Sequence, residues 1–143
     1  MKSQCAAELF RNGFLCSQSV LAAFCDSYGL DRNSALKIAS GFGSGMNCAE
    51  ICGAVSGAVQ VIGLKYGHSD VKDTDAKQMC KAKVKEFLGV FLERNRHITC
   101  REILGCDINT PEGKQKALDE KLFTTVCVDV VSSAATILEE LGY

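Results

Sequence analysis

Residues 47–66 read NCAEICGAVSGAVQVIGLKY, and this stretch predicts a helix with one closely packed face. Asn47 and Glu50 form a capping box, in which the N-cap side chain accepts a hydrogen bond from the helix and the carboxylate reaches back. An apolar stripe follows, made of Cys52, Val55, Val59 and Ile62. Gly53 and Gly57 lie on another face, although glycine inside a helix costs about 1 kcal/mol relative to alanine. We therefore expect the two glycines to let a neighbouring helix approach closely.

The remainder of the chain carries further helical patterns and little that would break them. There is one proline in 143 residues, so the main helix breaker is nearly absent. Helices are predicted from Phe14 to Tyr28, Asp31 to Ile38, Thr74 to Arg94, Thr99 to Gly105 and Leu122 to Leu141, with a loop or tight turn at Gly41–Gly45 and a short turn at Thr110–Pro111. The pattern predicts an all-α fold, a compact single-domain bundle of about five or six helices. This helical, cysteine-rich domain is expected to cover residues 1–143.

Composition places the chain among globular proteins. Hydrophobic residues make up 47% and charged residues 23% of the chain, values typical of one folded domain rather than a disordered or fibrous protein. The formal net charge is -1, so the chain lacks the basic field with which nucleic-acid-binding proteins gather phosphates. We therefore expect no nucleic acid partner.

Two further observations favour a cytoplasmic location. The opening residues Met1–Gln4 are soon followed by Glu8 and Arg11, which interrupt the apolar run that a secretory signal needs. No stretch reaches the roughly 18 apolar residues of a membrane span. The nearest, Ala54–Leu64, ends at Lys65. We expect a cytoplasmic protein without membrane insertion.

The nine cysteines are the most unusual feature of the composition. An odd number cannot be fully paired within one chain, so at least one thiol stays free. In a reducing cytosol, cysteines are more often buried hydrophobes, redox centres or metal ligands than structural disulfides. No Cys-x-x-Cys is present, the spacing of thioredoxin-type active sites and paired zinc knuckles. Spacing alone leaves these three interpretations open.

Helical position gives some of the cysteines a chemical expectation. Cys48 and Cys100 each follow a predicted N-cap, where free N–H groups and the helix dipole favour a thiolate, so both should be unusually acidic. Cys52 lies one turn inside its predicted helix, and Cys127 lies on the apolar face of the last one, where free cysteines often fill the core. In a helix, the Cβ atoms of Cys48 and Cys52 would be about 5 to 6 Å apart. That spacing is too wide for a disulfide but suits two ligands.

Residues 52–57, Cys-Gly-Ala-Val-Ser-Gly, read together with Cys16, Cys100 and Cys127, give the chain a resemblance to a known family. It resembles the C-GCAxxG-C-C family of small redox-active proteins, which carry four characteristic cysteines and a CGAxxG motif. The resemblance extends over nearly the whole chain, beginning near Asn12 and ending in the last helix. It implies redox activity without implying a particular mechanism.

The resemblance also implies a set of four catalytic residues, namely Cys16, Cys52, Cys100 and Cys127. Cys48 is outside the family pattern and is kept as a secondary redox candidate for its predicted position. In one interpretation the four form thiol and disulfide pairs, in which Cys100 attacks and a second thiol resolves the mixed disulfide. In the alternative interpretation, the same four thiolates bind zinc or an iron–sulfur cluster.

A third interpretation makes all nine cysteines core thiols of a non-catalytic interaction module. The redox interpretation is favoured over it, and we expect clustered cysteines to perform thiol–disulfide exchange or electron transfer, as in an oxidoreductase or electron carrier. The partner would be a redox protein that the sequence does not identify. A small bundle with a glycine-lined helix could also form a homodimer.

Overall fold

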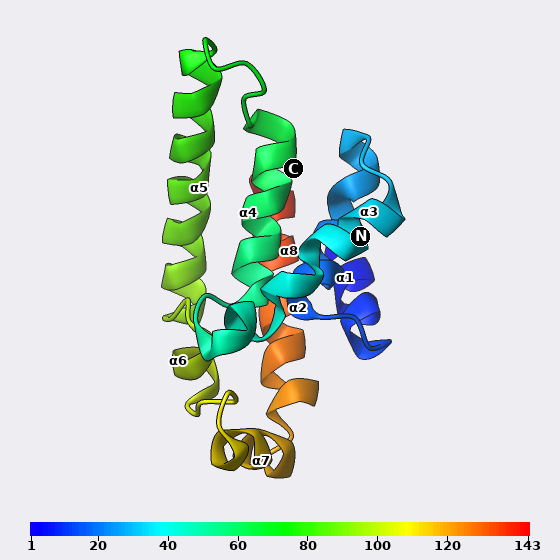
Figure 1. Ribbon diagram of the computed structural model, residues 1–143, viewed down its shortest axis with the longest axis vertical. Coiled ribbons are helices and arrows are strands. Elements are labelled where there is room, and N and C mark those ends of the chain that lie inside the picture. The colour runs from blue at the N-terminus through cyan, green and yellow to red at the C-terminus, as the bar shows by residue number, and fades with distance from the viewer.

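The computed structural model describes residues 1–143 as an all-helical protein without strands, with 76% of the residues in helices (Figure 1). The α-helices are α1 (Lys2–Arg11), α2 (Cys16–Phe24), α3 (Arg32–Ala39), α4 (Gly53–Tyr66), α5 (Thr74–Asn95), α6 (Cys100–Leu104), α7 (Pro111–Asp119) and α8 (Val126–Glu140). Short 3-10 turns cover Cys25–Tyr28, Ser40–Phe42 and Leu122–Thr124. The predicted all-α class is confirmed, and the expected five or six helices are eight.

Two helices, α1 and α7, account for the difference in number. Of the four buried residues of α1, Ser3, Ala6 and Ala7 are small, and only Leu9 is a large apolar side chain, so the helix gives little hydrophobic signal in the sequence. At α7, the Thr110 hydroxyl accepts a hydrogen bond from the Gly113 N–H, and Pro111 occupies the first helical position. The predicted short turn is therefore the start of a helix of 9 residues.

The core of the bundle surrounds α4. Helix α2 packs along α4, α5 and α8 contact α4 on other sides, and α1 packs against α8 (Figure 1). The largest fully buried side chains belong to these helices and include Leu21, Phe24, Ile62, Phe87, Phe91 and Ile137. Helices α6 and α7 lie at the lower end of Figure 1, where α8 begins. This end of the bundle holds the candidate site.

The two glycines of α4 permit its close contact with α2. A Cβ atom on Gly57 would lie 2.8 Å from the Ser17 carbonyl oxygen and 3.1 Å from the Val20 Cβ. A Cβ atom on Gly53 would lie 3.0 Å from the Cys16 Cβ. Any larger residue would therefore push the helices apart. The predicted close approach is confirmed, and it brings Cys16 against the first turn of α4.

The capping box predicted at Asn47 and Glu50 is wrong. The four consecutive residues Ser44–Asn47 have positive φ and form a left-handed turn. Helix α4 begins later, at Gly53, with Cys52 as its N-cap. A left-handed conformation costs roughly 1–2 kcal/mol per non-glycine residue, so contacts elsewhere in the fold must hold this turn.

Pairing with a distant segment explains the late start of α4. The Cys52 N–H donates to the Ile98 carbonyl at 2.8 Å, and the Cys100 N–H donates to the Glu50 carbonyl at 2.7 Å. These bonds flank an isolated antiparallel bridge between Ile51 and Thr99. Because the backbone is extended and paired across the bridge, it cannot also form the first turn of a helix.

One segment, Leu122–Glu140, is long and apolar enough to cross a membrane by length and composition alone. It comes closer to a membrane span than Ala54–Leu64, the segment that the sequence suggested as nearest. The core helices of soluble proteins pass the same test. Helix α8 forms most of this segment, and it packs against α1, α4 and α5.

Candidate functional site

The four cysteines singled out by the family resemblance all lie at the start of a helix. Cys16 is the first residue of α2, Cys52 is the N-cap of α4, Cys100 is the first residue of α6, and Cys127 is the second residue of α8. The first turn of a helix has N–H groups without helical partners and a positive dipole end. The sequence predicted such a position for Cys100 among these four, but not for Cys52 or Cys127.

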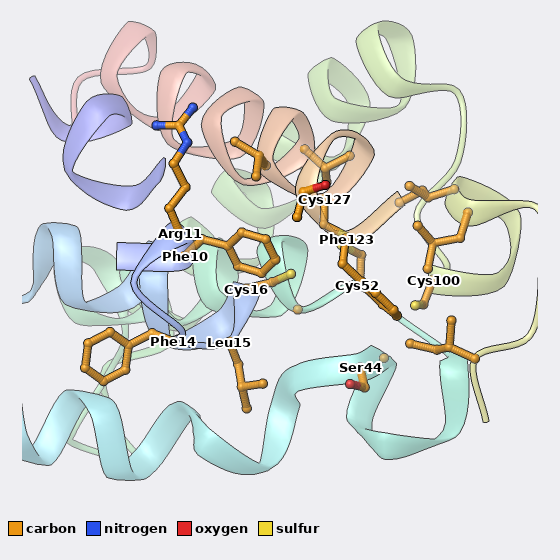
Figure 2. Close-up of a pocket in the computed structure, with 18 of the residues that line it drawn as sticks. Phe10, Arg11, Phe14, Leu15, Cys16, Ser44, Cys52, Cys100, Phe123 and Cys127 are labelled. Carbon is orange, nitrogen blue, oxygen red and sulfur yellow. The ribbon is translucent and has the colours of Figure 1, made fainter. Parts of the chain in front are cut away.

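These four side chains line one cavity of about 570 Å³. Figure 2 shows them reaching the cavity from different helices, with the rings of Phe10 and Phe123 nearby. Thirteen of the 19 lining residues are hydrophobic. The fold therefore brings four thiols into a largely apolar cavity, although they are spread from α2 to α8 in the sequence.

Cys52 and Cys100 are held in place by the antiparallel bridge. The bridge lies between them, with Ile51 directly before Cys52 and Thr99 directly before Cys100. Both cysteines are buried, with exposed fractions of 7% and 8%. An ion pair between Glu50 and Arg101 crosses the same junction at the surface. The pairing therefore fixes the two thiols relative to each other at the cavity.

Cys16 and Cys127 line the same cavity and have opposite pKa shifts. Interaction with the Cys127 side chain raises the pKa of Cys16 well above its ordinary value, and burial adds to the increase. Interaction with the Cys16 side chain lowers the pKa of Cys127, against the opposing effect of burial. The thiolate form is therefore favoured at Cys127 and the protonated form at Cys16.

Burial raises the pKa of the other two thiols. It raises the pKa of Cys52 to about 11, although the N–H groups of Ala54 and Val55 favour the thiolate. It raises the pKa of Cys100 to about 12, with further increases from the neighbouring thiols Cys52 and Cys127. The expectation of an acidic Cys100 is therefore wrong. The helix start at Cys100 is correctly predicted. Desolvation raises the pKa of the thiol by more than the N-terminus of a helix of 5 residues lowers it.

A family model described as "Putative redox-active protein (C_GCAxxG_C_C)" matches residues 14–141. The chain belongs to the C_GCAxxG_C_C family. The match includes the whole of every helix from α2 to α8, and it contains all four cavity cysteines. No curated protein and no solved structure matches the chain.

Cys48 does not join the four cysteines of the C_GCAxxG_C_C pattern. It is exposed directly after the left-handed turn, its thiol donates to the Gly45 carbonyl at 3.4 Å, and it does not line the cavity. The prediction that it follows an N-cap, one helical turn before Cys52, is wrong because α4 begins at Gly53. All nine cysteines are free thiols.

The donor geometry bears on the metal alternative for this family member. No group of three or more His, Cys, Asp or Glu side chains lies close enough together to hold a metal ion. The four cavity thiols would have to move toward one another to form the tetrahedral set that zinc requires. In this arrangement the four thiols line one cavity without forming a metal-binding group.

Proposed function

We propose that this protein is a thiol–disulfide redox protein in which Cys16 and Cys127 are the reacting pair. The observation that carries the proposal is that both cysteines line one cavity from the first turns of α2 and α8, where their interaction lowers the pKa of Cys127 and raises the pKa of Cys16. Thiol–disulfide exchange needs such a division, because a thiolate attacks and a second thiol then resolves the mixed disulfide.

In this proposal Cys127 attacks and Cys16 resolves. On oxidation, the two residues lose two electrons and two protons and form one S–S bond, while an acceptor gains two electrons. The lowered pKa of Cys127 supports this assignment. The raised pKa of Cys100, about 12, argues against the attacking role that its position in the sequence suggested.

Cys52 and Cys100 are assigned a second role at the same site. Both stay protonated near neutral pH, because burial raises the pKa of each thiol. Both face the cavity that holds Cys16 and Cys127. We expect them to exchange with the Cys16–Cys127 disulfide when a neighbouring side chain moves. A cytoplasmic location suits this role, because cytosolic reductants would return the pair to its thiol form.

Thiol counting in redox buffers tests the proposal. Reduced protein is equilibrated in mixtures of reduced and oxidised dithiothreitol, and the free thiols are counted after denaturation. Of the nine thiols in the chain, we expect two to disappear together. Cys16→Ser and Cys127→Ser should each abolish this loss over the same range. Cys48→Ser is the matched control, because Cys48 is exposed and lies outside the cavity wall.

The opposite results would overturn the proposal. If Cys16→Ser and Cys127→Ser still lose two thiols at the wild-type midpoint, other cysteines form the couple. Circular dichroism of each variant establishes that the helices remain intact. Zinc, iron and acid-labile sulfide are measured on anaerobically purified protein. One zinc, or iron with matching sulfide, per chain would favour the four-thiolate centre instead.

A further inference from the structure

The wall of the cavity is almost free of charge. Arg11 is its one charged lining residue, and Figure 2 shows the Arg11 side chain directed away from the four cysteines. Ser44 and Thr124 are the polar lining residues other than the thiols. A ligand with several ionised groups would lose its hydration in this cavity without gaining partners. A neutral ligand would avoid that penalty.

Aromatic side chains give the cavity a preference for a flat ring. Phe10, Phe14 and Phe123 all line it, together with aliphatic side chains from α6 and α8. Phenylalanine rings pack well against planar π systems by stacking or edge contacts. The cavity volume of about 570 Å³ falls within the roughly 300–1,000 Å³ of small-molecule sites. The cavity therefore has the size and lining of a site for a small aromatic molecule.

Access to the thiols also favours a small molecule over a folded protein. Cys52 and Cys100 are more than nine-tenths buried, and Cys16 and Cys127 are partly buried. A protein disulfide would have to approach these sulfurs directly, whereas a small ligand can occupy the cavity that they line. An acceptor that fits inside the cavity reaches Cys16 and Cys127 from the side that they line.

We propose that the cavity binds a neutral quinone and that the Cys16–Cys127 dithiol reduces it to the hydroquinone. This inference rests on the proposed function and adds the class of substrate. The Phe10 and Phe123 side chains, which lie beside the cysteines in Figure 2, hold the ring, and the two thiols supply the electrons.

The reaction balances with these groups and one proton from water. The Cys127 thiolate adds to the quinone ring and forms a C–S bond. The Cys16 sulfur then attacks the Cys127 sulfur, so the S–S bond forms and the C–S bond breaks. The electron pair of the C–S bond stays on the ring. The ring takes up the Cys16 proton and one proton from water, and it leaves as the hydroquinone.

Tetramethyl-1,4-benzoquinone is the appropriate probe, because its ring positions are fully substituted and stable thiol adducts are disfavoured. Fully reduced protein is mixed with this quinone without oxygen, and loss of quinone absorbance is followed together with the thiol count. We expect one quinone reduced for every two thiols lost. Glutathione disulfide, which carries several charges, should oxidise the protein more slowly than the quinone.

Two variants test whether the cavity holds the ring. Phe123→Ala removes a ring from the cavity wall and should lower the second-order rate constant for quinone about tenfold. The midpoint of its thiol loss in the dithiothreitol redox buffers should stay at the wild-type value. Leu118→Ala is the control, because Leu118 is 52% exposed and does not line the cavity. It should change the quinone rate by less than about twofold.

The outcomes separate the inference from the function on which it rests. A Cys16–Cys127 couple in dithiothreitol buffers without quinone reduction overturns the inference and leaves the proposed function standing. Equal quinone rates for wild type and Phe123→Ala also overturn it, as does faster oxidation by glutathione disulfide. If the dithiothreitol couple itself is absent, the proposed function fails as well.

Discussion

Cys127 is the one cavity cysteine whose pKa is lowered. All four cavity cysteines lie at helix starts, so the helix dipole alone does not distinguish them. Burial raises the pKa of Cys52 and Cys100, whereas interaction with the Cys16 side chain lowers the pKa of Cys127 despite its burial. A specific neighbour therefore distinguishes the proposed nucleophile from the other thiols.

Changing the side chain at position 16 should change the pH dependence of Cys127. Cys16→Ala removes the interaction that lowers the pKa of Cys127, so this pKa should rise and alkylation of Cys127 should require higher pH. Each unit of increase lowers the thiolate fraction at neutral pH about tenfold. Cys16→Ser keeps a donor and should retain a low pKa. The measurement is the rate of iodoacetamide labelling of Cys127 against pH, read by mass spectrometry.

Identical pH profiles for wild type and Cys16→Ala would contradict the role of the Cys16 side chain. A profile that moves equally in Cys16→Ala and Cys16→Ser would point to packing rather than to the donor. Labelling of Cys48, which lies on the surface turn, serves as the internal reference in every sample.

The residues of the site were only partly predictable from the sequence. The family resemblance selected the four cysteines that line the cavity, and a local cap predicted the helix start at Cys100. The pairing of Cys16 with Cys127 was not visible, because it depends on how α2 and α8 meet. The effect of burial on Cys100 was missed for the same reason, since desolvation depends on the folded surroundings.

At the scale of elements, the contact between α2 and α4 positions the site. Gly53 and Gly57 let α2 lie against α4, and the Cys16 Cβ is in near contact with Gly53. The start of α4 is also fixed from outside the helix by pairing with the segment before α6. Cys16, Cys52 and Cys100 are therefore held by two backbone contacts around one helix start.

Alanine substitutions within α4 should separate packing from helix propensity. In Gly57→Ala, the new Cβ would lie 2.8 Å from the Ser17 carbonyl oxygen. Overpacking costs about 1–3 kcal/mol and outweighs the propensity gain of about 1 kcal/mol, so the free energy of unfolding should fall. Gly63 has no neighbour within 4 Å, so Gly63→Ala should raise it by about 1 kcal/mol. Urea unfolding measures the free energy of unfolding of both variants. Equal effects of Gly57→Ala and Gly63→Ala would contradict the close contact between α2 and α4.

The N-cap of α6 offers a second test at this scale. The Thr99 hydroxyl accepts a hydrogen bond from the Glu102 N–H at 3.2 Å. Thr99→Ala should lower the free energy of unfolding by about 1 kcal/mol and make Cys100 react faster with thiol reagents. Thr110→Ala removes the equivalent cap of α7, which holds no cavity cysteine, and should leave Cys100 unchanged. Equal Cys100 labelling in both variants would contradict the link between cap and site.

Element prediction succeeded where local chemistry decides the structure and failed where distant pairing decides it. The caps at Asp31 and Thr99 were readable because the side chain and its partner N–H lie within three residues. Asn47 and Glu50 show an equally good local pattern. There the antiparallel bridge from Ile51 to Thr99 takes precedence, and no local pattern could reveal a partner so far along the chain.

For the whole molecule, the main feature is the meeting of four helix starts at one cavity. Helices α2, α4, α6 and α8 each bring a cysteine to it. Helical periodicity predicted the all-α class correctly, but it does not say which helix ends meet. That information is in the packing of the bundle, so the cavity and its apolar lining were not predictable from the sequence.

The bundle also bears on the expected homodimer. The glycine face that suggested it is covered within the chain, because Gly53 and Gly57 contact α2. A homodimer would have to use another surface, and it stays a prediction.

The most direct test of the account is to identify the disulfide in oxidised wild-type protein. Trypsin leaves Cys127 as the only cysteine in residues 122–143, whereas residues 12–32 contain both Cys16 and Cys25. The account predicts that these two peptides become linked, that fragmentation places the bond on Cys16, and that dithiothreitol reverses it. Three results would contradict this prediction. They are a bond to Cys25, a bond that joins other cysteines, and no disulfide in the most oxidising of the dithiothreitol buffers.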